Sequence, residues 1–302
     1  MQHIIALGFF DGAHLGHAGL LKRAKEISLE KGIASMALTF DRHPDEFVHG
    51  RKVPLLNTKQ ERRDIIKERF GIDSVCFTAF DDEIMHMPWE DFMDKVLIKE
   101  HGAAHLVVGH DFCFGYKGLG TAKLLKERCL MLGLGCDIIP EVSLEGVTVS
   151  STHIRTLIAE GNMDEAARFL GYRHFIGGTA IRGRGIGKKE LFATANITPE
   201  EGLVIPAFGV YATRVLVDGK YYDAVTNVGR NPTVGLTDKV MVESHILDFS
   251  GELYDKPLRV LFYRHLRPEI KFPHKEALKE QIAKDINTAR SVLSAAPLEE
   301  RI

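Results

Sequence analysis

Short apolar runs alternate with amphipathic helical patterns up to about residue 172 of the chain. The runs that predict strands are Ile4–Leu7, Ala34–Phe40, Ser74–Thr78, His105–Val108 and Cys136–Ile139. The patterns that predict helices are Ala18–Glu30, Lys59–Phe70, Trp89–Lys99 and Thr121–Leu132. Continuous apolar strands separated by helices are typical of a parallel sheet covered on both faces. We therefore expect an α/β fold here, with ligands at the carboxyl ends of the strands.

The pattern changes after a helix predicted over Met163–Leu170, which ends at Gly171. Strand-like alternation then replaces the helices, over Gly209–Val217, Tyr221–Val228, Val240–Phe249 and Leu258–Tyr263. Turn residues such as Asp218-Gly219 separate these runs and indicate antiparallel hairpins. They predict a small barrel or sandwich, closed by a helix from Lys275 to about Leu293. We expect two domains, residues 1–172 and 173–302.

Composition narrows the class of protein. The chain has 45% hydrophobic and 26% charged residues, which is typical of a globular protein. A formal net charge of −2, without a dense Lys/Arg run, argues against a nucleic-acid-binding surface. No apolar stretch approaches the roughly 20 residues of a membrane span, and Met1 leads directly into a strand. We expect no signal peptide, no membrane partner and a cytoplasmic location; homo-oligomerisation is left open.

The four cysteines lie in the first half of the chain and form no C-x-x-C pair: Cys76, Cys113, Cys129 and Cys136. Their spacing argues against a zinc site, and four thiols in a chain of this length do not make a disulfide framework. We expect reduced and mostly buried thiols.

The first predicted strand leads into GFFDGAHLGH, Gly8 to His17. Its glycines, Gly8, Gly12 and Gly16, let the backbone come close to a ligand, and the helix N-terminus that follows suits phosphate. His14 and His17 are three residues apart, so they project from one face of the helix and can donate to phosphate oxygens. The segment predicts a nucleotide site that works on phosphate. The alternative is a surface turn with two incidental histidines.

Two further loops follow predicted strands. TFDRHP, residues 39–44, places Asp41 and His43 at a strand end, and its alternative is a polar loop closed by proline. GHDFCFG, residues 109–115, holds Phe112 and Phe114 between glycines. Aromatic rings exposed there can stack on a flat ligand, whereas the alternative is core packing.

SSTHIR, residues 150–155, is a second candidate for phosphate binding. Ser150, Ser151 and Thr152 can cap a helix that runs to about Ala159, and Arg155 lies one turn further on. Hydroxyls, helix N–H groups and a guanidinium together suit a triphosphate. Plain helix capping is the alternative.

The second half opens with the basic, glycine-rich RGRGIGKK, residues 182–189. Glycine N–H groups with Arg184, Lys188 and Lys189 can hold phosphates, although a solvated basic turn is the alternative. LFATAN follows at residues 191–196. Thr194 and Asn196 are two apart, so in an extended segment they face one side and offer oxygen ligands to Mg²⁺.

Glu243 is the other informative residue of this half. The period-2 pattern of the predicted strand places it on a largely apolar face with Met241, His245, Leu247 and Phe249. A carboxylate on such a face is costly unless it is paired or functional. The alternative is an outward-facing acid on an edge strand.

These motifs carry a resemblance to a known family. G-x-F-D-G-x-H-x-G-H resembles the signature of the nucleotidyltransferases related to class I aminoacyl-tRNA synthetases. In this wording it is most similar to the FAD synthetase half of the prokaryotic bifunctional riboflavin kinase/FAD synthetases. TFDRHP, GHDFCFG and SSTHIR resemble the family's T-F-x-P-H-P, G-x-D-F-x-F-G and S-S-T-x-x-R, with Arg42 in place of proline and Cys113 in place of arginine.

The second half resembles the riboflavin kinase signature G-x(4)-G-x(3)-G-R-x-x-G-F-P-T-A-N. Lys188 replaces arginine, Leu191 glycine and Ala193 proline, whereas the T-A-N triplet is intact. VESHILDF, NVGRNPTVG and LRPEIKF are similar to V-E-x-H-x-x-D-F, N-I-G-x-x-P-T-F and L-R-x-E-x-K-F. The resemblance covers nearly the whole chain in the family's order.

The resemblance implies a Rossmann-like nucleotidyltransferase domain with a parallel sheet, then an antiparallel β-barrel kinase domain with a terminal helix. It implies catalytic roles for His14, His17 and Arg155 in adenylyl transfer, and for Glu243 as general base of the kinase. The implied ATP contacts are Gly8, Phe10, Asp11, Gly16, Ser150, Ser151 and Thr152 in the first half, and Gly183, Arg184, Gly187 and Lys188 in the second. Asp111, Phe112 and Phe114 are the implied flavin contacts, and Thr194 and Asn196 the implied Mg²⁺ ligands.

The implied substrates are riboflavin, FMN and ATP, with Mg²⁺ as cofactor and FAD as product. One alternative is a flavin-binding regulator that has lost one or both activities. Its motivation is the altered LFATAN segment and a sequence that begins at the first strand, where family members usually carry a short leading segment. A second alternative keeps the first half as an enzyme with another acceptor, such as a pantetheine or nicotinamide phosphate, but leaves the barrel half without a role.

Overall fold

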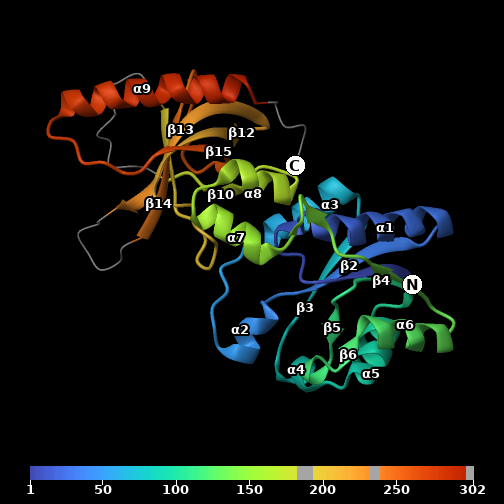
Figure 1. Ribbon diagram of the computed structural model, residues 1–302. Coiled ribbons are helices and arrows are strands. Elements are labelled where there is room, and N and C mark those ends of the chain that lie inside the picture. Colours follow the sequence, from blue (N-terminus) through green and yellow to red (C-terminus); the bar gives the residue numbers. More distant parts are fainter. Residues whose placement is uncertain (182–192, 232–238, 297–302) are drawn as a thin grey trace. The chain divides into compact units, whose positions relative to one another are not determined.

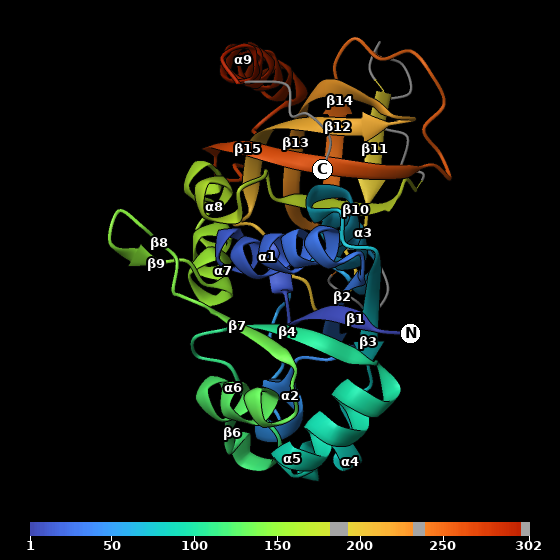
Figure 2. The same ribbon diagram turned by 90° about the vertical axis from the view of Figure 1, so that its right-hand side faces the viewer.

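The computed structural model describes residues 1–181, 193–231 and 239–296. By its internal contacts the chain forms two compact units, Met1–Ser151 and the residues that follow from Thr152. The first is built around a parallel sheet and the second around an antiparallel one (Figures 1 and 2). The change of fold class along the chain is the one that the hydrophobic pattern predicts.

The sheet of the first unit has five parallel strands in the order β3-β2-β1-β4-β7. Their bounds are β1 His3–Leu7, β2 Ala34–Phe40, β3 Ser74–Thr78, β4 Ala103–Gly109 and β7 Gly135–Ile139. The order reverses between β1 and β4, and ligands of such sheets bind at the reversal, outside the carboxyl ends of the strands. The loops after β2, β1 and β4 are therefore neighbours at one edge of the sheet.

Helices cover both faces of this sheet (Figure 2). One face carries α1 (Leu15–Lys31) and α3 (Lys59–Phe70). The other carries α6 (Ala122–Met131) and α5 (Trp89–Asp91), which continues into a π-helical segment, Phe92–Glu100. On that second face a core forms among Ile5, Leu7, Leu38, Leu106, Val108, Met93, Leu97 and Leu125. Burial of each such side chain stabilises the unit by about 1.5–3 kcal/mol.

The remaining elements of this unit are short. They are α2 Pro44–His49, α4 Asp82–His86, the 3₁₀ turns Asp11–Ala13 and Tyr116–Gly118, the ribbon of β5 Cys113–Phe114 with β6 Gly120–Thr121, and the ribbon of β8 Ser143–Leu144 with β9 Val147–Thr148. None of them is predicted from hydrophobic periodicity, because each is shorter than two helical turns or three residues of strand.

Two helices lead into the second sheet. Helix α7 (Ser151–Ala159) begins at the last residue of the first unit, and α8 (Met163–Leu170) packs on strand β15 (Pro257–Arg267). Asp164 of α8 binds Arg173 at 2.8 Å and Arg264 of β15 at 3.0 Å. These contacts attach α8 to the second unit.

Six antiparallel strands form the second sheet, in the order β10-β15-β12-β13-β14-β11. The bounds of the other five are β10 Phe175–Thr179, β11 Ala193–Ile197, β12 Gly209–Val217, β13 Lys220–Asn231 and β14 Lys239–Ile246. An isolated bridge between Ile181 and Asn196 joins the two outer strands, so the sheet closes into a small barrel. Helix α9 (Lys275–Ser294) lies across β12, β13 and β15 (Figure 1).

Several predicted elements are confirmed to the residue, among them Ala34–Phe40, Lys59–Phe70, Met163–Leu170 and Gly209–Val217. Asp218-Gly219 is a two-residue hairpin turn with positive φ at both positions, 48° and 78°. One strand prediction was too long, since β14 ends at Ile246 and not at Phe249. No helix within the described ranges is both long and apolar enough to cross a membrane.

Candidate active sites

The loop after β1 has an unusual backbone. Phe10 and Ala13 adopt φ of 56° and 36°, a left-handed conformation that side chains rarely take, and Gly12 adopts 76°. Phe10 is fully buried and holds this turn against the protein. A Cβ at Gly16 would lie 3.0 Å from the His14 ring and 3.1 Å from the Val149 carbonyl oxygen. Glycine at 16 is therefore what lets these groups close in on the start of α1.

His14 and His17 stack on each other at the start of α1. Their ring centroids are 3.7 Å apart with an interplanar angle of 16°. His14 caps the helix, and its Nδ1 accepts a hydrogen bond from the main-chain N–H of His17 at 3.4 Å. The ring of Phe10 meets His17 edge-on at 5.4 Å. The two imidazoles thus project from one face, as their spacing predicts.

The surroundings of His17 disfavour the protonated form of its imidazole. Burial lowers its pKa well below the usual value, and the positive charges of His14 and Arg62 lower it further. Its Nδ1 is buried and has no hydrogen-bond partner among the described residues. A buried nitrogen of this kind is costly unless a ligand completes its hydrogen bond. A bound phosphate would supply both the acceptor and the negative charge that favours protonation.

Asp11 holds three segments together from inside the loop. Its carboxylate Oδ1 accepts the main-chain N–H of Leu56 at 2.8 Å, and its carbonyl oxygen accepts the hydroxyl of Ser151 at 3.0 Å. The side chain is 2% exposed. This burial favours a positioning role for Asp11, with the adjacent main chain left to approach a ligand.

Arg62 is a site residue that the sequence analysis missed. It is 1% exposed and donates to the carbonyl oxygens of Phe9 at 2.6 Å, in the loop after β1, and of Phe40 at 3.4 Å, the last residue of β2. Burial lowers its pKa to about 10, against the opposite effect of Asp11 and Asp41. Helix α3 fixes its position through a capping box between Thr58 and Glu61. That box, T-K-Q-E, was the signal in the sequence for a helix start, although it does not reveal the role of Arg62.

The loop after β2 lies against the loop after β1. His43 contacts the Phe9 ring edge-on at 4.7 Å, and Thr39 Oγ1 donates to the Phe9 carbonyl oxygen at 2.8 Å. His43 also caps α2, and Asp41 accepts the main-chain N–H of Phe80 at 2.9 Å. Asp41 therefore fixes its own loop, while Thr39 and His43 border the candidate nucleotide site.

The loop after β4 divides its aromatic residues between core and surface. Phe114 is 8% exposed and packs with Trp89 and Phe92 in the core. Phe112 is half-buried and stacks on Phe114 at 5.3 Å, and Asp111 is exposed. Core packing therefore applies to Phe114 fully and to Phe112 in part, and stacking of Phe112 on a flat ligand stays a prediction.

SSTHIR forms the start of α7. The helix ends at Ala159, as predicted, and its first residue is Ser151, which was expected as a cap. Ser151 joins Asp11, as described, and Ser150 comes directly before the helix. Thr152 and Arg155 continue α7 in the second compact unit, with Arg155 one turn beyond Ser151.

A second polar cluster lies on the barrel, across β11, β14 and β13. Asn196 of β11 is the register partner of Glu243 of β14, which in turn is the partner of Asn227 of β13. Register partners on antiparallel strands point to one face with Cβ atoms about 4.5–5.5 Å apart. Thr194 lies two residues from Asn196 on that face. A hydroxyl, an amide oxygen and a carboxylate are the hard oxygen donors that Mg²⁺ prefers, so these residues fit the ion.

Glu243 was expected on a largely apolar face of its strand, and this prediction was wrong. Along β14 the buried residues are Val242, Ser244 and Ile246, so Glu243 lies on the more open face of the strand. The strand is not at the edge of the sheet, because β11 pairs beyond it. The residue as a whole is exposed, and partial desolvation of its carboxyl raises the pKa of Glu243. A raised pKa makes this carboxylate a better proton acceptor.

Asn227 and Glu269 are further residues that sequence reasoning did not single out. Asn227 Nδ2 donates to Glu269 Oε1 at 3.3 Å, and a Cβ at Gly229 would collide with the Glu269 carboxylate. The two residues belong to NVGRNPTVG and LRPEIKF, and their contact explains why both motifs accompany the cluster around Glu243. Gly183, Arg184, Gly187 and Lys188 lie outside the described residues, as does Leu191.

Comparisons with known proteins match the two halves separately and together. The family model for FAD synthetase matches residues 1–153, and that for riboflavin kinase matches residues 170–293. The bifunctional riboflavin kinase/FMN adenylyltransferase of Pseudomonas fluorescens is 34% identical over 298 residues, covering 99% of this chain and 94% of that protein. The enzyme of the same name from Listeria monocytogenes is 33% identical over 297 residues, covering 96% and 92%.

A solved structure shares the fold. The crystal structure of a Streptococcus pneumoniae protein described as a macrolide-efflux protein superposes with a TM-score of 0.85 at 26% identity, covering 96% of this chain and 94% of that one. Relatives that match over almost the full length carry both domains in one chain. With its stacked histidines after β1 and its Asn196–Glu243 pair on the barrel, the chain belongs to the bifunctional riboflavin kinase/FAD synthetase family.

Proposed function

We propose that the chain makes FAD from riboflavin in two ATP-dependent steps, phosphorylation to FMN and adenylylation of FMN to FAD. The observation that carries this is the presence of two separate polar clusters, each within the residues matched by its own family model. The domains of this proposal are residues 1–172 and 173–302. The division by internal contacts falls earlier, after Ser151, so the proposal alone assigns α7 and α8 to the first domain.

In the first domain the FMN phosphate attacks the α-phosphorus of ATP. A new P–O bond forms, the bond to the β-phosphate breaks and pyrophosphate leaves. His14 and His17 hydrogen-bond the phosphates and stabilise the charge that develops on the leaving group. Protonation of His17 accompanies nucleotide binding, because its lowered pKa rises next to the phosphates.

The remaining residues of this domain bind and orient the substrates. Ser150, Ser151, Thr152 and Arg155 bind the triphosphate through hydroxyls, helix N–H groups and the guanidinium. Gly8, Phe10, Asp11 and Gly16 shape the loop that receives the nucleotide. For the flavin, Phe112 offers a ring face supported from behind by Phe114, and Asp111 adds a polar contact.

In the second domain Glu243 removes the proton of the riboflavin 5′-hydroxyl, whose oxygen attacks the γ-phosphorus of a first ATP; ADP leaves. Thr194 and Asn196 would hold Mg²⁺, which when bound spreads the negative charge of the transferred phosphoryl group. Asn227 orients the face that carries Glu243 through its bond to Glu269. Gly183, Arg184, Gly187 and Lys188 bind the ATP phosphates.

One assay tests both activities. The chain is incubated with riboflavin, ATP and Mg²⁺, and the flavins are separated by chromatography over time. FMN is expected first and FAD after it, with ADP and pyrophosphate as coproducts. Unchanged riboflavin at saturating ATP would instead support the regulator. FMN supplied directly tests the first domain alone.

A further inference from the structure

Arg62 is a charged side chain buried inside the first unit. It lies in the first turn of α3 and is 1% exposed. A buried guanidinium is costly unless hydrogen bonds satisfy it, so the groups that it binds indicate its role. We propose that Arg62 is a positioning residue of the adenylyl transfer, which holds the Phe9–Phe10 turn and thereby places His17 for the reaction. This inference rests on the function proposed for the first domain.

Arg62 contacts Phe9 in two ways. Its Nη1 donates to the Phe9 carbonyl oxygen at 2.6 Å, and its Cζ lies 4.3 Å from the centroid of the Phe9 ring. Its Nη2 donates to the carbonyl oxygen of Phe40, the last residue of β2, at 3.4 Å. One rigid, planar group therefore fixes both the main chain and the ring of Phe9 relative to the end of β2.

A second donor reaches the same carbonyl oxygen of Phe9. Thr39 Oγ1 donates to it at 2.8 Å, and Thr39 is also 1% exposed. A carbonyl oxygen has two lone pairs, so it can accept both bonds at once. Loss of one donor leaves the other in place, whereas loss of both releases the carbonyl group. Arg62 and Thr39 should therefore depend on each other in their effect on the turn.

The turn that these donors hold is strained. Phe10 adopts a φ of 56°, a left-handed conformation that persists only where the surrounding structure holds it. Its carbonyl oxygen accepts the main-chain N–H of Ala13 at 2.9 Å, and its ring meets the His17 ring edge-on at 5.4 Å. The orientation of the Phe9–Phe10 peptide therefore sets the position of the ring against which His17 packs.

A loosened turn should slow the chemical step. A displacement of about 1 Å in a group that acts in the transition state can cost about 10²-fold in rate. Loss of the Arg62 contacts should therefore lower kcat for FAD formation and change KM for ATP less. If Arg62 served folding alone, its loss would reduce the folded fraction and leave kcat per folded molecule unchanged.

The test measures FAD formation from FMN by the full-length chain, with FMN formation from riboflavin as the internal reference. Arg62→Met keeps much of the side chain's length and removes the guanidinium. Circular dichroism at the assay temperature gives the folded fraction, and rates are taken per folded molecule. We expect kcat for FAD formation to fall by about 10- to 100-fold and FMN formation to stay the same. An unchanged kcat in folded Arg62→Met would overturn the proposal, whereas absence of FAD formation by the unaltered chain would contradict the proposed function itself.

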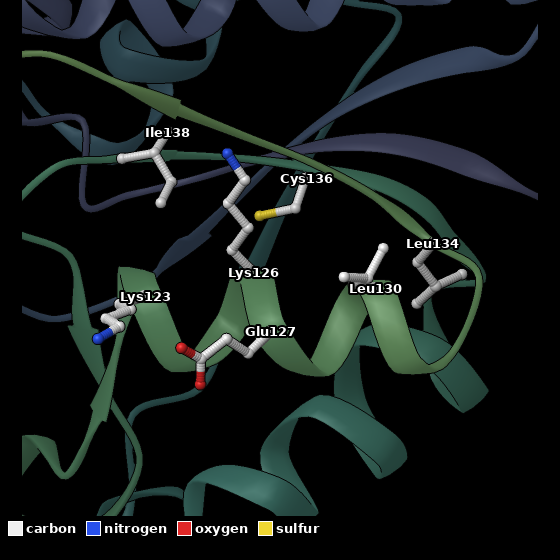
Figure 3. Close-up of a pocket in the computed structure, with 7 residues that line it drawn as sticks. All are labelled: Lys123, Lys126, Glu127, Leu130, Leu134, Cys136 and Ile138. Carbon is white, nitrogen blue, oxygen red and sulfur yellow. The ribbon is translucent and has the colours of Figure 1, made fainter.

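Two matched controls remove a positive charge elsewhere in the same unit. Arg63→Met changes the next residue of α3, whose Cζ lies 5.2 Å from the centroid of the Phe77 ring. Lys126→Met changes a residue of α6, on the other face of the sheet, that lines a hollow of about 430 Å³ between α6 and β7 (Figure 3). Both variants should keep kcat for FAD formation. A fall in both equal to that in Arg62→Met would overturn the proposal, because loss of any cation would then suffice.

A pair of conservative variants tests the shared carbonyl oxygen, and decides the matter if Arg62→Met does not fold. Arg62→Lys keeps one donor for Phe9 but cannot bind Phe40 as well, so its kcat should be lowered only in part. Thr39→Val removes the second donor. The double variant should lower kcat by more than the product of the two single effects, since a flexible ammonium then holds the oxygen alone. An effect equal to the product would overturn the proposal.

Discussion

Asn196 and Glu243 are register partners across β11 and β14, so a predicted metal ligand and a predicted base point to one face of the barrel. Neither residue's motif contains the other, and the antiparallel pairing alone brings them together. Asn196 is 5% exposed, whereas Glu243 lies on the open face. One member of the pair is therefore buried in the barrel and the other is accessible to solvent. This arrangement suits a base next to a cation-bound phosphate.

Replacement of Glu243 by glutamine should remove the kinase activity and leave the adenylyl transfer. Loss of a general base costs about 10²–10⁴ in rate. FMN formation from riboflavin is measured by chromatography, with FAD formation from added FMN as the internal reference. Glu252→Gln, an exposed acid of the same unit, serves as the control. Normal FMN formation by Glu243→Gln would exclude it as the base.

His17→Ala should have the converse effect. Loss of one preorganised donor to the transition state costs about 10²–10³ in rate, so FAD formation from FMN should fall by that factor. FMN formation from riboflavin should stay the same. His86→Ala, at an exposed position of the same unit, is the matched control. Equal slowing of both reactions would show that the two sites are not separate.

Arg62→Ala should weaken the first unit and its reaction together. The change removes the guanidinium donors of the Phe9 and Phe40 carbonyl oxygens, of which Phe9 keeps its bond from Thr39, and opens a cavity, at a cost of about 2–4 kcal/mol. Denaturant unfolding measures the loss, and FAD formation from FMN should fall with it. Arg63→Ala, the next residue on α3, provides the comparison. If Arg62→Ala unfolded like Arg63→Ala, the carbonyl contacts would be unimportant.

His174 should make the second unit sensitive to acid. It is 2% exposed, neither ring nitrogen has a hydrogen-bond partner within the described ranges, and burial lowers its pKa to about 4. Because the folded-state pKa lies below the unfolded value near 6.5, stability is full above that pH and falls toward pH 4, by at most about 3 kcal/mol.

Unfolding midpoints between pH 7 and pH 4 measure this slope. His174→Phe should flatten it, even if the variant is less stable at pH 7. Burial lowers the pKa of His245 and His265 too, so part of the slope remains. His274→Phe, at an exposed position, should keep the full slope, and an unchanged slope in His174→Phe would rule out the assignment.

The sequence predicted those parts of the site that lie in contiguous segments. The spacing of His14 and His17 was enough to predict a shared face, because helix geometry is local. The helix that follows Ser150 was predicted from residue type for the same reason. Arg62 could not be found in this way, since its partners are carbonyl oxygens of the loop after β1 and of the end of β2, and main-chain oxygens have no signature in a sequence.

Burial was harder to predict than position. Phe112 and Phe114 are alike in sequence, yet Phe114 is buried against Trp89 and Phe92, whereas Phe112 is only half-buried at the margin of the same core. For Glu243 the period-2 alternation correctly placed it on one face with Met241 and His245. That face is the more open one, and not the largely apolar face that was expected. Ser244, a polar residue, takes the buried side because its hydroxyl bonds Thr226 at 2.8 Å. Such internal partners come from other strands and do not show in a single run of residues.

The bonds made by Arg62 have a consequence for tolerance to substitution. A carbonyl oxygen is present whatever side chain its residue carries, so the acceptor at position 40 survives every exchange that keeps the strand. In a saturation library, many side chains at position 40 should therefore keep this bond, whereas few at position 62 should, because there a planar guanidinium reaches the loop after β1 and the end of β2 at once. Substitutions are therefore expected to be tolerated at position 40, which accepts the bond, and to be rejected at position 62, which donates it.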